Sequence, residues 1–67
     1  MITVQINGKD TELQPDQTVQ QYLEAKGLAG RSLAVAVNGE VLRREELAET
    51  RLSEGDTVEI VRPVGGG

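Results

Sequence analysis

The chain has 67 residues, the length of one small domain. It contains no cysteine and no histidine, which excludes disulfides and removes the commonest general base, the thiol nucleophile and most transition-metal ligands of enzymes. Eleven acidic and seven basic residues give a net charge of -4, which disfavours nucleic acid and anionic membrane surfaces as partners. We therefore expect no metal site, and a binding module or a substrate of other proteins is favoured over an autonomous enzyme.

The N-terminal stretch predicts a β-hairpin. Apolar and polar residues alternate over Ile2–Ile6, as in a strand with one buried face. Asn7-Gly8 is a turn dipeptide, because both residues tolerate positive φ. We expect the return strand over Thr11–Leu13, after a loop from Asn7 to Asp10 that is slightly longer than a two-residue turn.

A short helix is predicted next. Thr18 is an N-cap residue, and Gln21 stands three positions later, where a capping box places its second partner. Apolar residues at helical spacing follow, and Gly27 suits the position after a helix, where positive φ is favoured. The helix should run from about Val19 to Lys26 and needs tertiary packing to hold it, because it is short.

The second half of the chain predicts three further strands, with Asn38-Gly39 as a second turn signal and a single helical turn within Arg44–Glu49. The expected strands are Leu33–Val37, Glu40–Arg43 and Thr57–Arg62. The order β-β-α-β-β-β indicates an α+β fold with one helix packed across a mixed sheet of about five strands. The first and last strands, with the cleanest alternation, should be central. We expect a domain over residues 1–64 and a flexible glycine tail over residues 65–67.

Alternation in the last strand places Val58 and Ile60 toward the core and Val61 on the side away from the helix. Ala34 and Ala36 should lie on that same outer side. Together these residues are candidates for an apolar surface that docks partners. Small residues are also common on sheet surfaces without any such role.

The chain ends in Gly65-Gly66-Gly67, which follow the predicted last strand after Pro63 and Val64. Glycines add nothing to a core and are costly to order, so a purpose for this tail must lie in being thin and in presenting a terminal carboxylate. The bland alternative is an inert end or a linker remnant. The strand pattern immediately upstream favours the functional interpretation.

Three stretches resemble the β-grasp, ubiquitin-like sulfur carriers, above all the thiamine-biosynthesis family called ThiS. They are Gln17-Thr18-Val19 with Leu23, the stretch from Ala34 to Arg44 that contains Asn38-Gly39, and the stretch from Leu52 to Val61 that leads to the terminal glycines. They follow the order of the family and span nearly the whole chain. A terminal Gly-Gly alone is a weak signal, but shortly after the stretch Gly-Asp-Thr-Val-Glu-Ile-Val in so short a chain it is fairly specific.

The resemblance implies a carrier that is not itself an enzyme and binds no cofactor. A ubiquitin-activating-type (ThiF-like) adenylating enzyme would use ATP to activate the Gly67 carboxylate. A persulfide from a cysteine desulfurase route would then convert it to a thiocarboxylate, and a ThiG-like thiazole synthase would accept the sulfur. Gly65 and Gly66 would let the tail enter partner active sites. Because the sequence shows no apolar run long enough for a membrane span and no signal-peptide pattern, we expect a cytoplasmic protein, and we expect it to be a monomer when free.

Three alternatives remain open from the sequence. The small subunit of molybdopterin synthase (MoaD-like) uses the same tail chemistry, although its relatives are usually longer. A ubiquitin-like modifier would join its terminus to lysines. A non-catalytic ubiquitin-like interaction module would carry an inert tail, and deletion of Gly67 would leave its binding unchanged.

Overall fold

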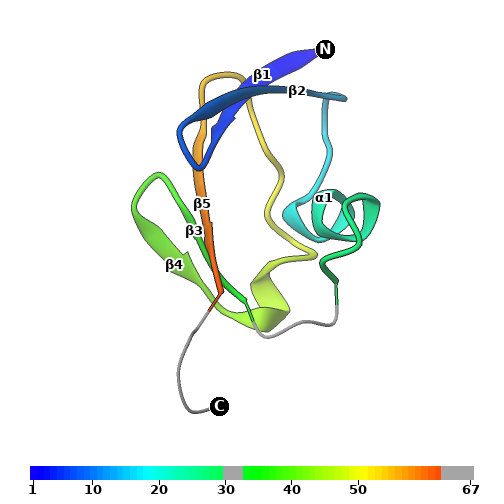
Figure 1. Cartoon of the computed structure of the whole chain (residues 1–67). Coiled ribbons are helices and arrows are strands. Elements are labelled where there is room, and N and C mark those ends of the chain that lie inside the picture. Colours follow the sequence, from blue (N-terminus) through cyan, green and yellow to red (C-terminus); the bar gives the residue numbers. More distant parts are fainter. Residues whose placement is uncertain (30–32, 63–67) are drawn as a thin grey trace.

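The computed structural model describes residues 1–29 and 33–62, which form five strands, one α-helix and one 3₁₀ turn (Figure 1). In chain order they are β1 (Ile2–Ile6), β2 (Lys9–Leu13), α1 (Val19–Ala25), β3 (Ala34–Val37), β4 (Glu40–Leu42), η1 (Arg44–Glu46) and β5 (Thr57–Val61). All the predicted elements are present in the predicted order, and their ends differ from the prediction by at most two or three residues.

The five strands form one mixed sheet in the order β2-β1-β5-β3-β4. β1 and β5 are parallel, and the other neighbouring pairs are antiparallel. β5 therefore occupies the centre with β1 beside it, as their alternation predicted. The helix α1 lies across one face of the sheet and leaves the opposite face uncovered by any helix of the described residues (Figure 1). The predicted α+β arrangement is confirmed.

The β1–β2 hairpin corrects one prediction. Its turn consists of Asn7 and Gly8 alone, since Ile6 already pairs with Lys9, the first residue of β2. The expected longer loop to Asp10 was wrong. Lys9 and Asp10 have low strand propensity, but the tight turn fixes the register of the hairpin and carries both exposed residues into the ladder.

The start of α1 has the predicted capping box. The Thr18 hydroxyl accepts the Gln21 backbone N–H at 3.1 Å, and the Gln21 side chain accepts the Thr18 backbone N–H at 2.9 Å. Lys26 is the C-cap rather than the last helical residue, and Gly27 follows with φ +72°, the left-handed conformation that glycine adopts at low cost. Two reciprocal bonds at one end and a glycine stop at the other define this short helix.

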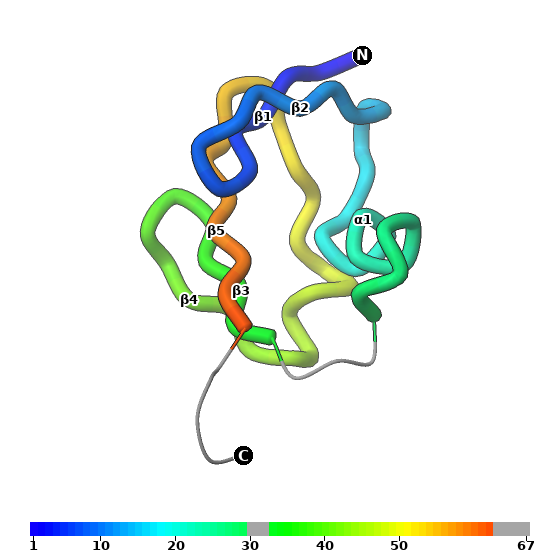
Figure 2. Tube along the Cα trace, in the orientation of Figure 1, coloured from blue at the N-terminus to red at the C-terminus, as the bar shows by residue number. Residues whose placement is uncertain are grey.

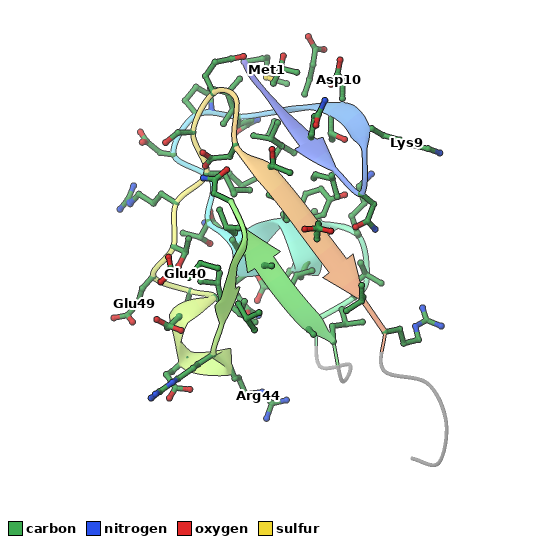
Figure 3. The ribbon with its side chains drawn as sticks, turned by 90° about the vertical axis from the view of Figure 1, so that its left-hand side faces the viewer. Met1, Lys9, Asp10, Glu40, Arg44 and Glu49 are labelled. Atoms are coloured by element: carbon green, nitrogen blue, oxygen red, sulfur yellow. The ribbon has the colours of Figure 1, made fainter. Side chains whose placement is uncertain are left out.

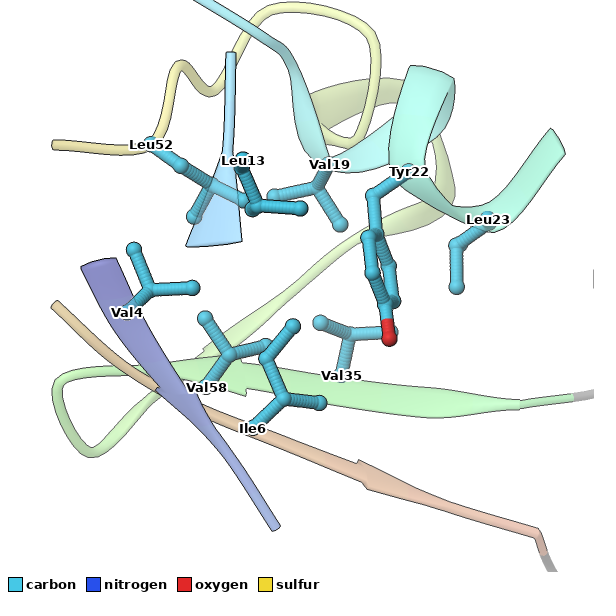
Figure 4. Packing of buried hydrophobic residues seen from close by; sticks show 9 residues of the cluster. All are labelled: Val4, Ile6, Leu13, Val19, Tyr22, Leu23, Val35, Leu52 and Val58. Carbon is cyan, nitrogen blue, oxygen red and sulfur yellow. The ribbon is translucent and has the colours of Figure 1, made fainter. Parts of the chain in front are cut away.

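The core lies between α1 and the sheet and is almost entirely aliphatic (Figure 4). Val4, Val58 and Val35, from three neighbouring strands, are each 2% exposed or less. The complete set of buried side chains is Val4, Ile6, Leu13, Val19, Tyr22, Leu23, Val35, Leu52 and Val58. Ile60 faces the same side as predicted but is only partly buried, packed against the edge of this cluster.

The connection from β4 to β5 runs back across the molecule to the start of α1 (Figure 2). Its backbone bonds there directly: Val19 N–H donates to Thr50 O at 3.0 Å, and Leu52 N–H donates to Gln17 O at 2.9 Å. Leu52 is buried in the core and Leu47 packs against it, so these two residues anchor the crossover. The expected helical turn is the 3₁₀ turn η1.

Candidate functional site

The three strands β4, β3 and β5 present small and apolar side chains on the face away from α1, the face toward the viewer in Figure 3. In the antiparallel register Ala34 pairs with Val61, and Ala36 pairs with Glu59. On its other side Ala36 pairs with Val41 of β4. The predicted candidates Ala34, Ala36 and Val61 are therefore direct neighbours on one surface.

These residues form a shallow groove of about 180 Å³, which we call the outer groove. Its lining consists of Ala34, Val35, Ala36, Val41, Glu59 and Val61. The two alanines form the floor because their side chains are short, and the valines of the flanking strands rise on either side. Val41 and Val61 are 72% and 56% exposed, a high exposure for β-branched apolar residues on a sheet.

Val41 is the groove residue that the sequence analysis missed. The signal was present, since alternation along Glu40–Leu42 places Val41 opposite to Leu42 and hence on the outer side. Cross-strand pairing with Ala36 could be known only from the register of the hairpin. The register of β5 against β3 places Glu59 on the other side of Ala36, so one carboxylate stands within an otherwise apolar lining.

The other half of the same face is polar. On β1 and β2 the side chains of this face include those of Thr3, Gln5, Asp10 and Glu12, and Thr57 continues them on β5. Charged side chains surround the described part of the molecule, as the labelled Lys9, Asp10, Glu40, Arg44 and Glu49 in Figure 3 illustrate. The outer groove is thus an apolar region bounded by polar surface, which is typical of a protein-interaction site.

The outer groove lies at the end of β5 from which the chain continues to the C-terminus. Val61, the last residue of β5, is both a wall of the groove and the sixth residue before Gly67. A partner bound in the groove would therefore hold the chain close to the root of its tail. Gly65, Gly66 and Gly67, the predicted working end, lie outside the described residues.

The described residues contain no group of three or more Asp or Glu side chains arranged to hold a metal ion. Partial burial raises the pKa of the Tyr22 phenol above its ordinary value of 10.0. Tyr22 belongs to the core side of the sheet and does not line the outer groove.

A second, wider hollow of about 520 Å³ lies at the loop between β2 and α1. It is lined by Gln14, Pro15, Asp16, Gln17 and Gln21. The Asp16 carboxylate is 82% exposed and lies 4.0 Å from the Arg51 guanidinium, a spacing at which a surface ion pair contributes little. This hollow is larger than the outer groove, but it holds only amides, a proline and one solvated carboxylate, so we do not regard it as the functional site.

No helix among residues 1–29 and 33–62 has the length and apolar character needed to cross a membrane.

Comparisons with known proteins agree with this architecture. The sulfur carrier protein ThiS of Bacillus subtilis (strain 168) is 37% identical over 65 residues, covering 96% of this chain and 98% of its own length. The crystal structure of the thiamine biosynthesis protein ThiS from Geobacter metallireducens superposes with a TM-score of 0.84 at 33% identity, covering 98% of this chain and all of that chain. The solution structure of a thiamine biosynthesis protein from Geobacter metallireducens superposes with a TM-score of 0.78. The β-grasp prediction is therefore confirmed.

A thiazole synthase of Paramagnetospirillum magneticum (strain ATCC 700264 / AMB-1) also contains a related segment, 34% identical over 62 residues. That segment covers 92% of this chain but only 19% of the synthase. The family model of ThiS matches residues 4–67, which include the terminal glycines. On a match of this extent, together with the full-length relative and the common fold, the chain belongs to the ThiS family.

Proposed function

We propose that this protein is the sulfur carrier of thiazole formation in thiamine biosynthesis, with the Gly67 carboxylate as the group that carries sulfur. The observation that carries the proposal is the family match, which extends through the terminal glycines to residue 67. The relative of nearly the same length is a sulfur carrier protein, and the related segment in a thiazole synthase favours thiazole over molybdopterin as the destination of the sulfur.

The chemistry begins with activation, because a carboxylate is a poor electrophile. A carboxylate oxygen of Gly67 attacks the α-phosphorus of ATP in an adenylating enzyme, and pyrophosphate leaves. The terminal sulfur of a protein persulfide then attacks the acyl carbon and displaces AMP, which leaves an acyl disulfide. A second thiol cleaves the sulfur–sulfur bond, is itself oxidised to a disulfide, and releases the thiocarboxylate.

The terminal residues suit this sequence of reactions. Glycine leaves the acyl carbon unhindered toward both the phosphorus and the sulfur nucleophile, and Gly65 and Gly66 add no side chain that would obstruct a narrow channel. No histidine or cysteine of this chain is available for the catalytic steps. The adenylating enzyme, the sulfur donor and the thiazole synthase therefore supply the catalytic groups.

Docking is assigned to the outer groove. Ala34, Ala36 and Val61, together with Val41, offer partners an apolar surface beside the root of the tail. Burial of exposed apolar area stabilises a complex by about 25 cal/mol per Å² before the costs of association are subtracted. A partner that covers the groove would hold the tail within reach of its active site.

The test is the intact mass of the protein after incubation with a ThiF-like adenylating enzyme, ATP, a persulfide donor and a thiol. The carrier should gain the difference in mass between a sulfur and an oxygen atom, and the variant that lacks Gly67 should gain nothing. That variant should keep the melting temperature of the wild type, because the described core ends with β5. An unchanged mass with an adenylating enzyme that loads its own carrier would refute the proposal.

The destination of the sulfur is tested separately. Loaded protein mixed with a thiazole synthase and its small-molecule substrates should return to the mass of the unloaded carrier as thiazole forms. If the loaded protein instead returns to the mass of the unloaded carrier with the large subunit of molybdopterin synthase, it is the small subunit of that synthase.

A further inference from the structure

The two Asn-Gly turns of the chain share an unusual conformation and both contact β5. Asn7 and Asn38 each have φ +52°, in the left-handed region, and the glycines that follow them have φ +83° (Gly8) and +85° (Gly39). Both side chains leave their own hairpin and accept a backbone N–H from β5. Asn38 accepts the N–H of Thr57, the first residue of β5. Asn7 accepts the N–H of Ile60, the residue before the last one of β5.

The Asn7 side chain continues the hydrogen bonding of β1 to β5 beyond the last residue of β1. The parallel ladder between β1 and β5 proceeds by Gln5 N–H to Asp56 O and Asn7 N–H to Val58 O, both at 2.9 Å. The next bonds would fall at Ile60, but the chain has already turned away into β2. There the Asn7 Oδ1 accepts the Ile60 N–H at 2.8 Å, and the Asn7 Nδ2 donates to the Ile60 carbonyl at 3.2 Å. A side-chain amide has the same donor and acceptor as a peptide group, so it continues the ladder by one step.

Asn38 acts at the opposite end of β5. Its Oδ1 accepts the Thr57 N–H at 3.0 Å, its Nδ2 donates to Asp56 Oδ1 at 3.1 Å, and its backbone N–H donates to the Thr57 carbonyl at 2.7 Å. The same residue type in the same conformation thus stabilises the start of β5 at Thr57, three residues further from the C-terminus than Ile60. The chain provides a natural matched pair.

We propose that Asn7 is a positioning residue for the terminal carboxylate: by fixing Ile60 it sets the direction in which the chain leaves the sheet. The inference rests on the proposed carrier function. On one side β5 is held by β3 as far as the pair Ala34 and Val61. On the other side, within the described residues, the backbone of Ile60 is held by the Asn7 amide.

Fixing the strand end matters because Gly67 is tethered to it. The effective concentration of a tethered group at a target depends on where its anchor is held and on the length of the tether. If the end of β5 pivots on its single remaining neighbour, the residue to which the tail is attached no longer has one fixed position relative to the partner. Fewer encounters then reach the geometry that adenylation needs, which lowers the rate of the chemical step.

The experiment compares Asn7→Gly with Asn38→Gly. Glycine adopts φ +52° without strain, so each variant removes the amide and preserves the turn. Both variants lose hydrogen bonds of similar number, and both gain the same freedom in the unfolded chain. Their denaturation midpoints should fall by similar amounts, and loading is measured at a temperature where both are folded.

With a ThiF-like enzyme and ATP, Asn7→Gly should lower kcat of loading by about three- to tenfold and change KM by less than about twofold, as one or two lost hydrogen bonds allow. Asn38→Gly should change both constants by less than about twofold. Equal kcat values for the two variants, or an effect of Asn7→Gly on KM alone, would overturn the proposal. Asn7→Asp keeps the acceptor for the Ile60 N–H and loses the donor, so its kcat should lie between those of the wild type and Asn7→Gly.

Hydrogen exchange gives a readout that does not depend on loading. The Ile60 amide should exchange at least about tenfold faster in Asn7→Gly than in Asn38→Gly, because its acceptor has been removed. An Ile60 amide that stays equally protected would show that Asn7 does not hold the strand end. If the wild type itself is not loaded, the carrier function fails, while the exchange result still tests the contact between Asn7 and β5.

Discussion

The two faces of the sheet are built from the same strands but differ in how far their side chains are buried. On β5 the inward Val58 is 1% exposed, and three residues later the outward Val61 is 56% exposed. On β3 the inward Val35 is 2% exposed, whereas Ala34 and Ala36 line an open groove. The inner face has valines, leucines and a tyrosine from α1 to fill it, and the outer groove has no covering element among the described residues. Within one short strand, the buried face stabilises the fold, and the exposed face is the one to which we assign the docking of partners.

The largest expected effect comes from Val58→Ala on the inner face. Loss of two buried methyl groups and the cavity that remains should lower the free energy of unfolding by about 2–3 kcal/mol. In a domain of this size that corresponds to a drop in melting temperature of roughly 10 °C or more. Thermal unfolding followed by circular dichroism measures it.

The control is Val61→Ala on the outer face of the same strand. It makes the same chemical change at a largely exposed side chain, so the free energy of unfolding should change by less than about 0.5 kcal/mol. Comparable losses in the two variants would mean that the outer groove is part of the stabilising core, and the comparison of the two faces would be wrong.

The second prediction concerns recognition. Val41→Lys puts a charge into the outer groove on an edge strand, where lysine is well tolerated, so stability should be nearly unchanged. Binding a partner would have to desolvate that charge, and kcat/KM of loading by the adenylating enzyme should fall about tenfold, or ~1.4 kcal/mol.

Gln5→Lys provides the matched control, because Gln5 is exposed on the polar half of the same sheet. It adds the same charge to the same protein, so a long-range electrostatic effect would appear in both variants. Equal losses of kcat/KM in Gln5→Lys and Val41→Lys would remove the outer groove from the proposed docking surface.

Local patterns predicted most of this fold. The capping box of Thr18 and Gln21, the two Asn-Gly turns and the alternation in β1 and β5 each involve residues close in sequence, so their chemistry can be read from the chain. The same alternation placed Val61, Ala34 and Ala36 correctly on the outer face. Their assignment as a docking surface remains a prediction.

Features that depend on pairing between distant segments could not be read in this way. Val41 enters the outer groove only because β4 pairs with β3, and Glu59 only because β5 pairs with β3. The bonds of Asn7 to Ile60 join residues 53 positions apart. From the sequence Asn7 was only a turn residue, since its conformational preference is local while its partner is set by the parallel pairing of β1 and β5.

The smallest expected effect concerns Tyr22, the one titratable side chain of the core. Partial burial raises the pKa of its phenol above 10.0 in the folded protein, whereas the unfolded chain should keep the ordinary value. Between these two pKa values the folded state binds more protons than the unfolded state. The free energy of unfolding should therefore be independent of Tyr22 below about pH 10 and fall as pH rises above it.

Urea midpoints of the wild type and Tyr22→Phe at about pH 9 and about pH 11 measure this difference. Lysine titration affects both proteins alike, so only the extra fall in the wild type belongs to the phenol. Because Tyr22 is the sole aromatic residue, the absorbance of tyrosinate reports its titration directly, with an expected midpoint above pH 10.0. A midpoint at the ordinary value would mean that water reaches the ring freely, and the inner face would then be more open beside α1 than its aliphatic centre.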